Sequence, residues 1–282
     1  MVKSSKRGCV LSQASALKNR IAFSDLVSNG SRGDSVHEQY GNQAMSQHGL
    51  LWRPKSEGPF PTVIFLHGGC WSSAYDYQHA FLLCQSLARS GHMVWLPEYR
   101  RIGELGGGWP GTFQDVTESI AWLLGAEAAQ IDFDAVQLVG HSAGAHLALW
   151  LNRAQPGGMT LLAPQAIYWN RVVALAPITD LQLYGQGENS CQVMVSELLS
   201  SGGGIEVEHL SPIELGLRQP VQLVFSEGDV LVPAEQSCNY QNKTGCEALH
   251  IPDAGHFDFI HPETVAGDAV MRILGAYRDE DR

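Results

Sequence analysis

Short apolar runs alternate with longer amphipathic stretches along the chain from about residue 48. The apolar runs typical of strands are residues 49–54, 62–67, 93–99, 135–140, 172–180, 220–229 and 247–252. The amphipathic stretches typical of helices are residues 75–91, 112–126 and 262–277. Because parallel strands need long crossover connections, this alternation predicts an α/β fold with a doubly wound, mostly parallel sheet and helices on both faces.

Two segments depart from this alternation. Residues 1–24 carry five basic and no acidic side chains, so we interpret residues 1–38 as a flexible N-terminal tail, with an organelle transit peptide as the alternative. Residues 181–215 are rich in Gly and Ser and contain one short helical stretch at 191–199. We expect them to form a lid-like insertion over the carboxyl edge of the sheet, within a single domain that spans residues 39–282.

The charge of the chain narrows the range of partners. Lys and Arg number 18 against 29 Asp and Glu, for a net charge of −11, which disfavours nucleic acid because binding phosphates requires clustered basic residues. No run approaches the ~18 apolar residues that span a bilayer, and the start lacks the apolar core of about 7–15 residues found in an export signal. We therefore expect a cytoplasmic protein whose partner is a small-molecule substrate, and a homodimer is left open.

The six cysteines form no C-x-x-C pair and show no metal-ligand spacing. In the absence of an export signal, we interpret the compartment as reducing and the thiols as mostly free, with Cys70 and Cys84 acting as small hydrophobic groups. A bridge between Cys238 and Cys246 stays open as an alternative. The sequence offers no metal site, and no organic cofactor is expected.

The stretch LVGHSAGAHLALWL (138–151) contains the pattern G-x-S-x-G at 140–144. An apolar strand precedes it and an apolar helix follows, which is the context in which this pattern forms a nucleophile elbow. The two glycines let strand and helix pass closely, and the turn lifts the serine hydroxyl to a helix N-terminus, whose dipole favours negative charge. Ser142 is therefore predicted to be a catalytic nucleophile.

A second motif, HGGCW (67–71), directly follows an apolar strand. Two glycines at the end of a strand can turn backbone N–H groups toward one point, as an oxyanion hole requires. The predicted donors are the amides of Gly68, Gly69 or Cys70, with the amide of Ala143 opposite.

An acid and a base complete such a site in the chain order Ser, Asp/Glu, His. Asp229 ends an apolar run, where a carboxylate reaches the carboxyl edge of the sheet, and His256 stands in the loop after the last strand. These two residues are the predicted acid and base. The alternatives are Glu227 for the acid and His250 or His261 for the base.

Four further side chains are candidates for the substrate pocket. They are His67, Trp71, Trp109 and Phe257. His67 is expected to brace the glycine loop by hydrogen bonds rather than to act as a base. The glycine-rich stretch GELGGGWPG (103–111) lacks the Lys-Ser/Thr of a phosphate-binding loop and is interpreted as a flexible loop near the pocket.

With these motifs in place, residues from about 40 to 277 resemble the α/β-hydrolase superfamily, in its esterase/lipase branch with an HGG-x-W oxyanion loop. GHSAGAHLA is further similar to the kynurenine formamidase (arylformamidase) group. The resemblance implies an α/β-hydrolase fold and a triad of Ser142, Asp229 and His256. Cys70 stands where that group often has an aromatic residue.

These residues predict a serine hydrolase of small or medium carboxylic esters that forms an acyl-enzyme intermediate. An arylformamidase-type amidase is the alternative within the same chemistry. From another class, the fold could serve as a non-catalytic ligand receptor, because a fold does not fix a function.

Overall fold

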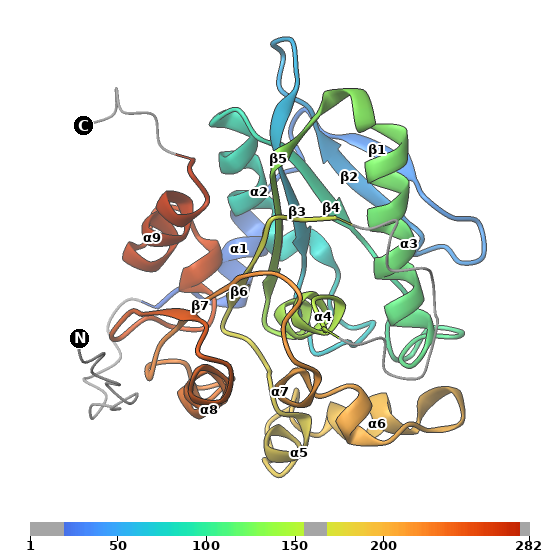
Figure 1. Cartoon of the computed structure of the whole chain (residues 1–282), viewed down its shortest axis with the longest axis vertical. Coiled ribbons are helices and arrows are strands. Elements are labelled where there is room, and N and C mark those ends of the chain that lie inside the picture. The colour runs from blue at the N-terminus through green and yellow to red at the C-terminus, as the bar shows by residue number, and fades with distance from the viewer. Residues whose placement is uncertain (1–19, 155–167, 277–282) are drawn as a thin grey trace, which may run out of the picture.

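The computed structural model describes residues 20–154 and 168–276. An eight-stranded sheet runs through it in the order β1-β2-β4-β3-β5-β6-β7-β8 (Figure 1). The strands are β1 (Val36–Gln39), β2 (His48–Trp52), β3 (Phe60–Leu66), β4 (Met93–Pro97), β5 (Ile131–His141), β6 (Arg171–Leu175), β7 (Val221–Phe225) and β8 (Glu247–His250). The pairs β1–β2 and β2–β4 are antiparallel, and all other pairs are parallel. The predicted mostly parallel sheet is confirmed.

Helices cover both faces of the sheet (Figure 1). One face carries α1 (Phe23–Asn29), α2 (Phe81–Arg89) and α9 (Val265–Ile273), and the other carries α3 (Gly111–Ala126), α4 (Ala143–Leu151) and α8 (Ala234–Thr244). Successive side chains of a strand point to opposite faces. Val63 and Phe65 accordingly join the core with α2, whereas Ile64 and Leu66 join the core with α4. Burial on both faces explains why these strands read as unbroken apolar runs.

The segment 181–215 contains three short helices. They are α5 (Leu181–Tyr184), α6 (Met194–Ser200) and α7 (Pro212–Leu215). Across the described parts of the chain, no helix combines the length and the apolar character that crossing a membrane would require.

Several predicted boundaries are wrong because loops begin earlier than the apolar runs end. β6 stops at Leu175 and β7 at Phe225, and the residues that follow them leave the sheet to build its carboxyl edge. The last helix begins at Val265 rather than at 262, because Thr264 caps it, with its hydroxyl accepting from the Gly267 amide at 2.9 Å. Helix α8 had no prediction, since its sequence AEQSCNYQNKT is mostly polar.

The prediction of a flexible tail over residues 1–38 is wrong for the part that the structure describes. Residues 20–39 contain α1 and β1, and the Leu26 side chain is fully buried in the core cluster that holds α2. Gly30 ends the helix so close to α2 that a Cβ there would lie 3.2 Å from the Phe81 Cβ. Residues 1–19 of the predicted tail lie outside the described residues.

Leu26→Ala tests whether α1 belongs to the folded domain. Removing a fully buried leucine leaves a cavity, so we expect the free energy of unfolding to fall by about 2–5 kcal/mol in urea denaturation. Val27 is the next residue on the same helix and is 37% exposed. Val27→Ala is the matched control and should change stability by no more than ~0.5 kcal/mol. Equal stability of Leu26→Ala and the control would contradict the placement of α1.

Candidate active site

Ser142 occupies the sharp turn between β5 and α4. Its backbone has φ 56° and ψ −120°, a region that a residue with a Cβ enters only at an energetic cost of order 1–3 kcal/mol. Its amide donates to the Leu175 carbonyl of β6 at 2.9 Å. The serine is the N-cap of α4, but its side chain makes no capping hydrogen bond. Its hydroxyl is therefore not bonded to the helix backbone.

Gly140 and Gly144 are required by the contact between strand and helix. A Cβ at Gly140 would lie 2.3 Å from the carbonyl oxygen of Gly144. One at Gly144 would lie 2.0 Å from the Leu66 carbonyl oxygen and 2.4 Å from that of His67. Neither position has room for any side chain, which explains why the G-x-S-x-G pattern requires glycine at both positions.

The structure brings the predicted acid and base together. The His256 Nδ1–H donates to Asp229 Oδ2 at 2.7 Å, and both side chains are buried. The other oxygen of Asp229 accepts from the amides of Leu231 and Val232 at 2.8 and 2.9 Å. These bonds fix the carboxylate, which in turn fixes the orientation of the imidazole. Ser142 and His256 line the same cavity.

The rival residues lie elsewhere. Glu227 and His250 form an ion pair with each other, and neither is among the described residues that line the cavity. His261 also lies outside the cavity lining. Sequence order alone had left these alternatives open.

His141 holds the loop of His256, the predicted base. Its Nε2–H donates to the main-chain carbonyl of His256 at 2.9 Å, and the two rings lie 4.6 Å apart. Burial, reinforced by the neighbouring His256 and His79, lowers the pKa of His141 well below its usual value. His141 is therefore neutral, with its proton on Nε2 and an unprotonated Nδ1 beside Gly68.

The glycine loop after β3 turns three residues into the left-handed region. Gly69, Cys70 and Trp71 have φ of 107°, 57° and 56°. Within residues 20–154 and 168–276, the amides of Gly69, Cys70 and Ala143 donate to no protein acceptor. Gly68 approaches the elbow so closely that a Cβ on it would lie 3.2 Å from the Ser142 Cβ. The loop therefore places unused N–H groups next to the serine.

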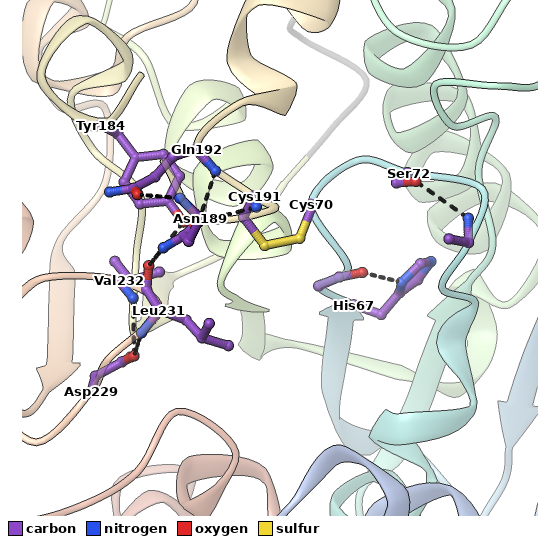
Figure 2. The surroundings of a disulfide bond; sticks show 12 residues. His67, Cys70, Ser72, Tyr184, Asn189, Cys191, Gln192, Asp229, Leu231 and Val232 are labelled. Carbon is purple, nitrogen blue, oxygen red and sulfur yellow. Dashed lines mark hydrogen bonds between the residues drawn. A yellow bond between two sulfur atoms is a disulfide. The ribbon is translucent and has the colours of Figure 1, made fainter. Parts of the chain in front are cut away.

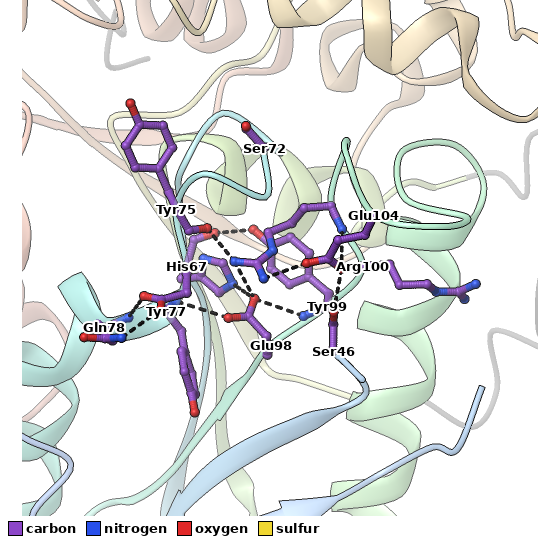
Figure 3. A network of polar contacts seen from close by, with 12 residues as sticks. Ser46, His67, Ser72, Tyr75, Tyr77, Gln78, Glu98, Tyr99, Arg100 and Glu104 are labelled. Atoms are coloured by element: carbon purple, nitrogen blue, oxygen red, sulfur yellow. Dashed lines mark hydrogen bonds and ion pairs between the residues drawn. The ribbon is translucent and has the colours of Figure 1, made fainter. Parts of the chain in front are cut away.

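A buried polar network braces this loop (Figure 3). The His67 Nε2–H donates to Glu98 Oε1 at 2.8 Å, and Nδ1 lies 2.8 Å from the Gly68 carbonyl oxygen. The Tyr99 hydroxyl donates to the His67 carbonyl at 2.7 Å, and Arg101 lies 3.3 Å from Glu98. Burial alone would raise the pKa of Glu98, but His67 and Arg101 outweigh it and lower that pKa. His67 thus makes the bracing hydrogen bonds expected of it.

A cavity of about 180 Å³ lies over Ser142. Its walls are mainly apolar and aromatic, and they come from segments far apart in sequence. The described residues that line it are Phe23, Gly69, Cys70, Tyr75, His79, His141, Ser142, Ser190, Cys191, Leu231, His256 and Phe257. Of the four side chains predicted for the pocket, only Phe257 lines it.

The pocket predictions for His67, Trp71 and Trp109 are wrong. The Trp71 side chain is fully buried, and its indole N–H donates to His146 Nδ1 at 3.2 Å, which ties the glycine loop to α4. Trp109 packs edge-on against Phe113 and joins the core beneath α3. His67 faces Glu98 behind the loop. Trp71 therefore packs behind the glycine loop and Trp109 packs in the core, and neither tryptophan lines the cavity.

Cys70 is bonded to Cys191, so the prediction of mostly free thiols is wrong (Figure 2). The bridge links the glycine loop to the segment 181–215 across a sequence separation of 121. Cys238 is also disulfide-bonded, whereas Cys84 and Cys246 are free. The proposed Cys238–Cys246 bridge is therefore wrong as well. The argument for a reducing compartment from unpaired thiols no longer holds, because disulfides persist mainly in oxidising environments.

Hydrogen bonds extend this bridge to the loop of Asp229 (Figure 2). The Asn189 Oδ1 accepts from the Cys191 amide at 3.1 Å, and its Nδ2 donates to the Leu231 carbonyl at 3.0 Å. The amide of Leu231 in turn donates to Asp229. Residues 189–191 thus connect the glycine loop to the acid, and Ser190 and Cys191 form one wall of the cavity.

Gly144→Ala tests the contact between α4 and β3. The added Cβ would overlap two carbonyl oxygens, so we expect the free energy of unfolding to fall by at least about 1–3 kcal/mol. Gly125→Ala on α3 is the control, because a Cβ there meets nothing within 4 Å and should stabilise the helix by up to ~1 kcal/mol. Equal urea midpoints for the two variants would refute the close approach.

The Cys70–Cys191 bridge should be detectable and stabilising. Peptide mapping without reductant is expected to recover one cross-linked peptide containing both residues. The double variant Cys70→Ser/Cys191→Ser should lose about 2–5 kcal/mol of stability. Cys246→Ser, at a half-buried free thiol, serves as the control and should stay within ~1 kcal/mol of wild type. Alkylation of both thiols in the unreduced native protein would contradict the bridge.

Comparison with solved structures shows the same fold. Esterase B from Lactobacillus rhamnosus HN001 superimposes with a TM-score of 0.75 at 21% identity, covering 90% of this chain and 88% of that one. Esterase 2 from the planctomycete Thermogutta terrifontis gives a TM-score of 0.68 at 18% identity, covering 86% and 91%. The same esterase phosphonylated by sarin gives 0.69 at 19% identity, covering 86% and 93%.

A family model defines the relationship more closely. The model BD-FAE matches residues 50–244, a range that includes the glycine loop, the elbow and Asp229 and ends before His256. This range is more than two thirds of the 282 residues. The chain, an α/β-hydrolase by its fold, belongs to the BD-FAE family.

Proposed function

We propose that the protein is a serine hydrolase that cleaves small carboxylic esters. One observation carries this proposal. A single cavity holds Ser142, at the N-terminus of α4, and His256, whose Nδ1–H donates at 2.7 Å to the buried Asp229. A nucleophile, a base and a group that orients the base are the parts that acyl transfer needs.

The tautomer of His256 determines its role. Because Nδ1 donates its proton to Asp229, Nε2 of the neutral ring carries a lone pair and can accept the Ser142 hydroxyl proton. The serine oxygen then attacks the ester carbonyl, and Asp229 stabilises the imidazolium that forms. His256 returns the proton to the leaving alcohol, and a water molecule, activated by the same base, releases the acid from the acyl-enzyme.

The amides of Gly69, Cys70 and Ala143 are the proposed oxyanion hole. Among the described residues they donate to no protein acceptor. Ala143 is the first residue of α4, so its amide lies at the N-terminus of that helix. Each such donor contributes roughly 10²–10³ in rate, because it is already oriented when negative charge develops on the carbonyl oxygen.

The size of the cavity favours small substrates. Its volume of about 180 Å³ lies below the ~300–1,000 Å³ of sites for drug-sized ligands. Apolar walls suit an alkyl or aryl group. Two of the structural neighbours are named esterases, and one is phosphonylated by sarin, a reagent class that also suits this serine.

An aryl formamide of the N-formylkynurenine kind is a second candidate substrate. Phe23, Tyr75 and Phe257 line the cavity, and aromatic side chains pack favourably against an aryl group. The same serine chemistry would cleave the formyl amide. The ester proposal and this one therefore differ in substrate and not in mechanism.

A labelling and turnover experiment tests the proposal. A fluorophosphonate probe should label wild type and leave Ser142→Ala unlabelled, whereas Ser196→Ala, at an exposed serine of α6, should label as wild type does. Turnover of p-nitrophenyl acetate and butyrate should fall by at least ~10⁴-fold in Ser142→Ala.

The substrate panel separates the alternatives. Faster turnover of N-formylkynurenine than of any ester would make the protein an amidase. No turnover of esters or amides, together with no probe labelling, would support the non-catalytic receptor and reject the proposed function.

A further inference from the structure

We propose that residues 20–29, here called the N-terminal strap, form the wall that limits substrate size, with Phe23 as the specificity-determining residue. This inference rests on the proposed function and deepens it, because it assigns the preference for short chains to one side chain. The strap lies outside the residues that match the family model, which begin at residue 50.

Phe23 closes the cavity with an aromatic ring. The ring lines the cavity together with Ser142 and His256, although it lies more than 100 residues from both along the chain. It packs against three other lining residues, at centroid distances of 5.3 Å to Tyr75, 5.5 Å to His79 and 5.6 Å to Phe257. Four rings from three segments therefore form one wall, and Phe23 is the one nearest to the N-terminus of the chain.

Helix α1 gives Phe23 a fixed position. The Asp25 carboxylate accepts from the Ala22 amide at 2.9 Å, which caps the first turn. One turn further, the Leu26 side chain is fully buried. Because Phe23 and Leu26 are three residues apart, they lie on the same face of the helix, and burial of Leu26 directs Phe23 inward.

The loop of the catalytic base anchors the start of the strap. The Ile21 amide donates to Asp258 Oδ1 at 2.9 Å, and Oδ2 of the same carboxylate accepts from the Gly255 amide at 2.8 Å. One buried carboxylate therefore joins the strap to the residue preceding His256.

Arg20 extends this anchor to the loop of the acid. Its guanidinium donates to the Gly228 carbonyl, one residue before Asp229. Its aliphatic part fills the space where Gly255 would carry a side chain, since a Cβ there would lie 2.9 Å from the Arg20 Cδ. Both loops of the proposed site thus hold the backbone of the strap, which fixes the position from which the Phe23 side chain enters the cavity.

A fixed aromatic wall in a cavity of about 180 Å³ excludes long chains. An acetyl or butyryl group needs no space beyond the ring, whereas a longer chain must displace it. One methylene group in a hydrophobic pocket changes selectivity by roughly 10–200-fold. Shortening Phe23 should therefore change selectivity strongly without touching the reacting atoms.

Phe23→Ala and Phe23→Leu test this wall. We would measure kcat/KM for p-nitrophenyl esters with acyl chains from acetate to octanoate, and for alkyl acetates with alcohols of matching length. The octanoate-to-acetate ratio, or the corresponding ratio in the alcohol series, should rise at least ~10-fold in Phe23→Ala and less in Phe23→Leu. The series that responds identifies whether Phe23 faces the acyl or the alcohol group.

Val27→Ala is the control on the exposed face of the same helix and should keep the wild-type chain-length profile. An active Phe23→Ala with an unchanged profile in both series, or a uniform loss on all substrates, would overturn the inference while leaving the proposed function intact. Absence of ester turnover in wild type would remove both together. Phe23→Leu keeps the test valid if the alanine variant unfolds.

Discussion

The close approach of α4 to the end of β3 is the constraint on which the site depends. At Gly144 the helix backbone lies so near the Leu66 and His67 carbonyls that not even a Cβ fits. This contact places the first turn of α4 directly beside the glycine loop that follows β3. A Cβ on Gly68 in that loop would lie 3.2 Å from the Ser142 Cβ. The predicted nucleophile and the unused backbone amides therefore meet by backbone packing, before any side chain is considered.

Two sets of buried polar groups, one on each side, hold the glycine loop in this position. On one side, Glu98 accepts from His67 and faces Arg101. On the other, the Trp71 indole donates to His146, whose Nε2–H donates to the Leu210 carbonyl at 2.9 Å. Burial lowers the pKa of His146 to about 4, so this ring is neutral at pH 7 and its tautomer is fixed by Leu210. The Trp71 indole and the His146 Nε2–H each have an acceptor, which is the condition for tolerating buried polarity.

The sequence predicted the sheet, the turn at Ser142 and the contact between Asp229 and His256 because each has a local signature. Apolar runs mark strands buried on both faces, and the chain order Ser142, Asp229, His256 needs no knowledge of distances. The pairing of Cys70 with Cys191 has no such signature, since a separation of 121 residues says nothing about proximity. Trp71 and Trp109 were misplaced for a related reason. A tryptophan beside a motif can pack below a loop or above it, and only tertiary contacts decide.

The N-terminal strap was missed because α1 has only seven residues and too few apolar positions to show a helical period. The Leu26 side chain is its single fully buried anchor. Its other contacts are hydrogen bonds and ring contacts with residues far away in sequence.

The proposed mechanism and the proposed choice of substrate depend on different parts of the chain. The sheet edge fixes Ser142, Asp229 and His256 through backbone contacts that tolerate little variation. The walls of the cavity come instead from segments added to that edge. Residues 190–191 are attached by a covalent bridge, and Phe23 is attached by hydrogen bonds and one buried leucine. The anchors of both walls lie outside the contact between α4 and β3, so the walls can vary without altering that contact. Under the proposed function, the residues at the sheet edge would carry out the reaction, and the strap and the segment 181–215 would select the substrate.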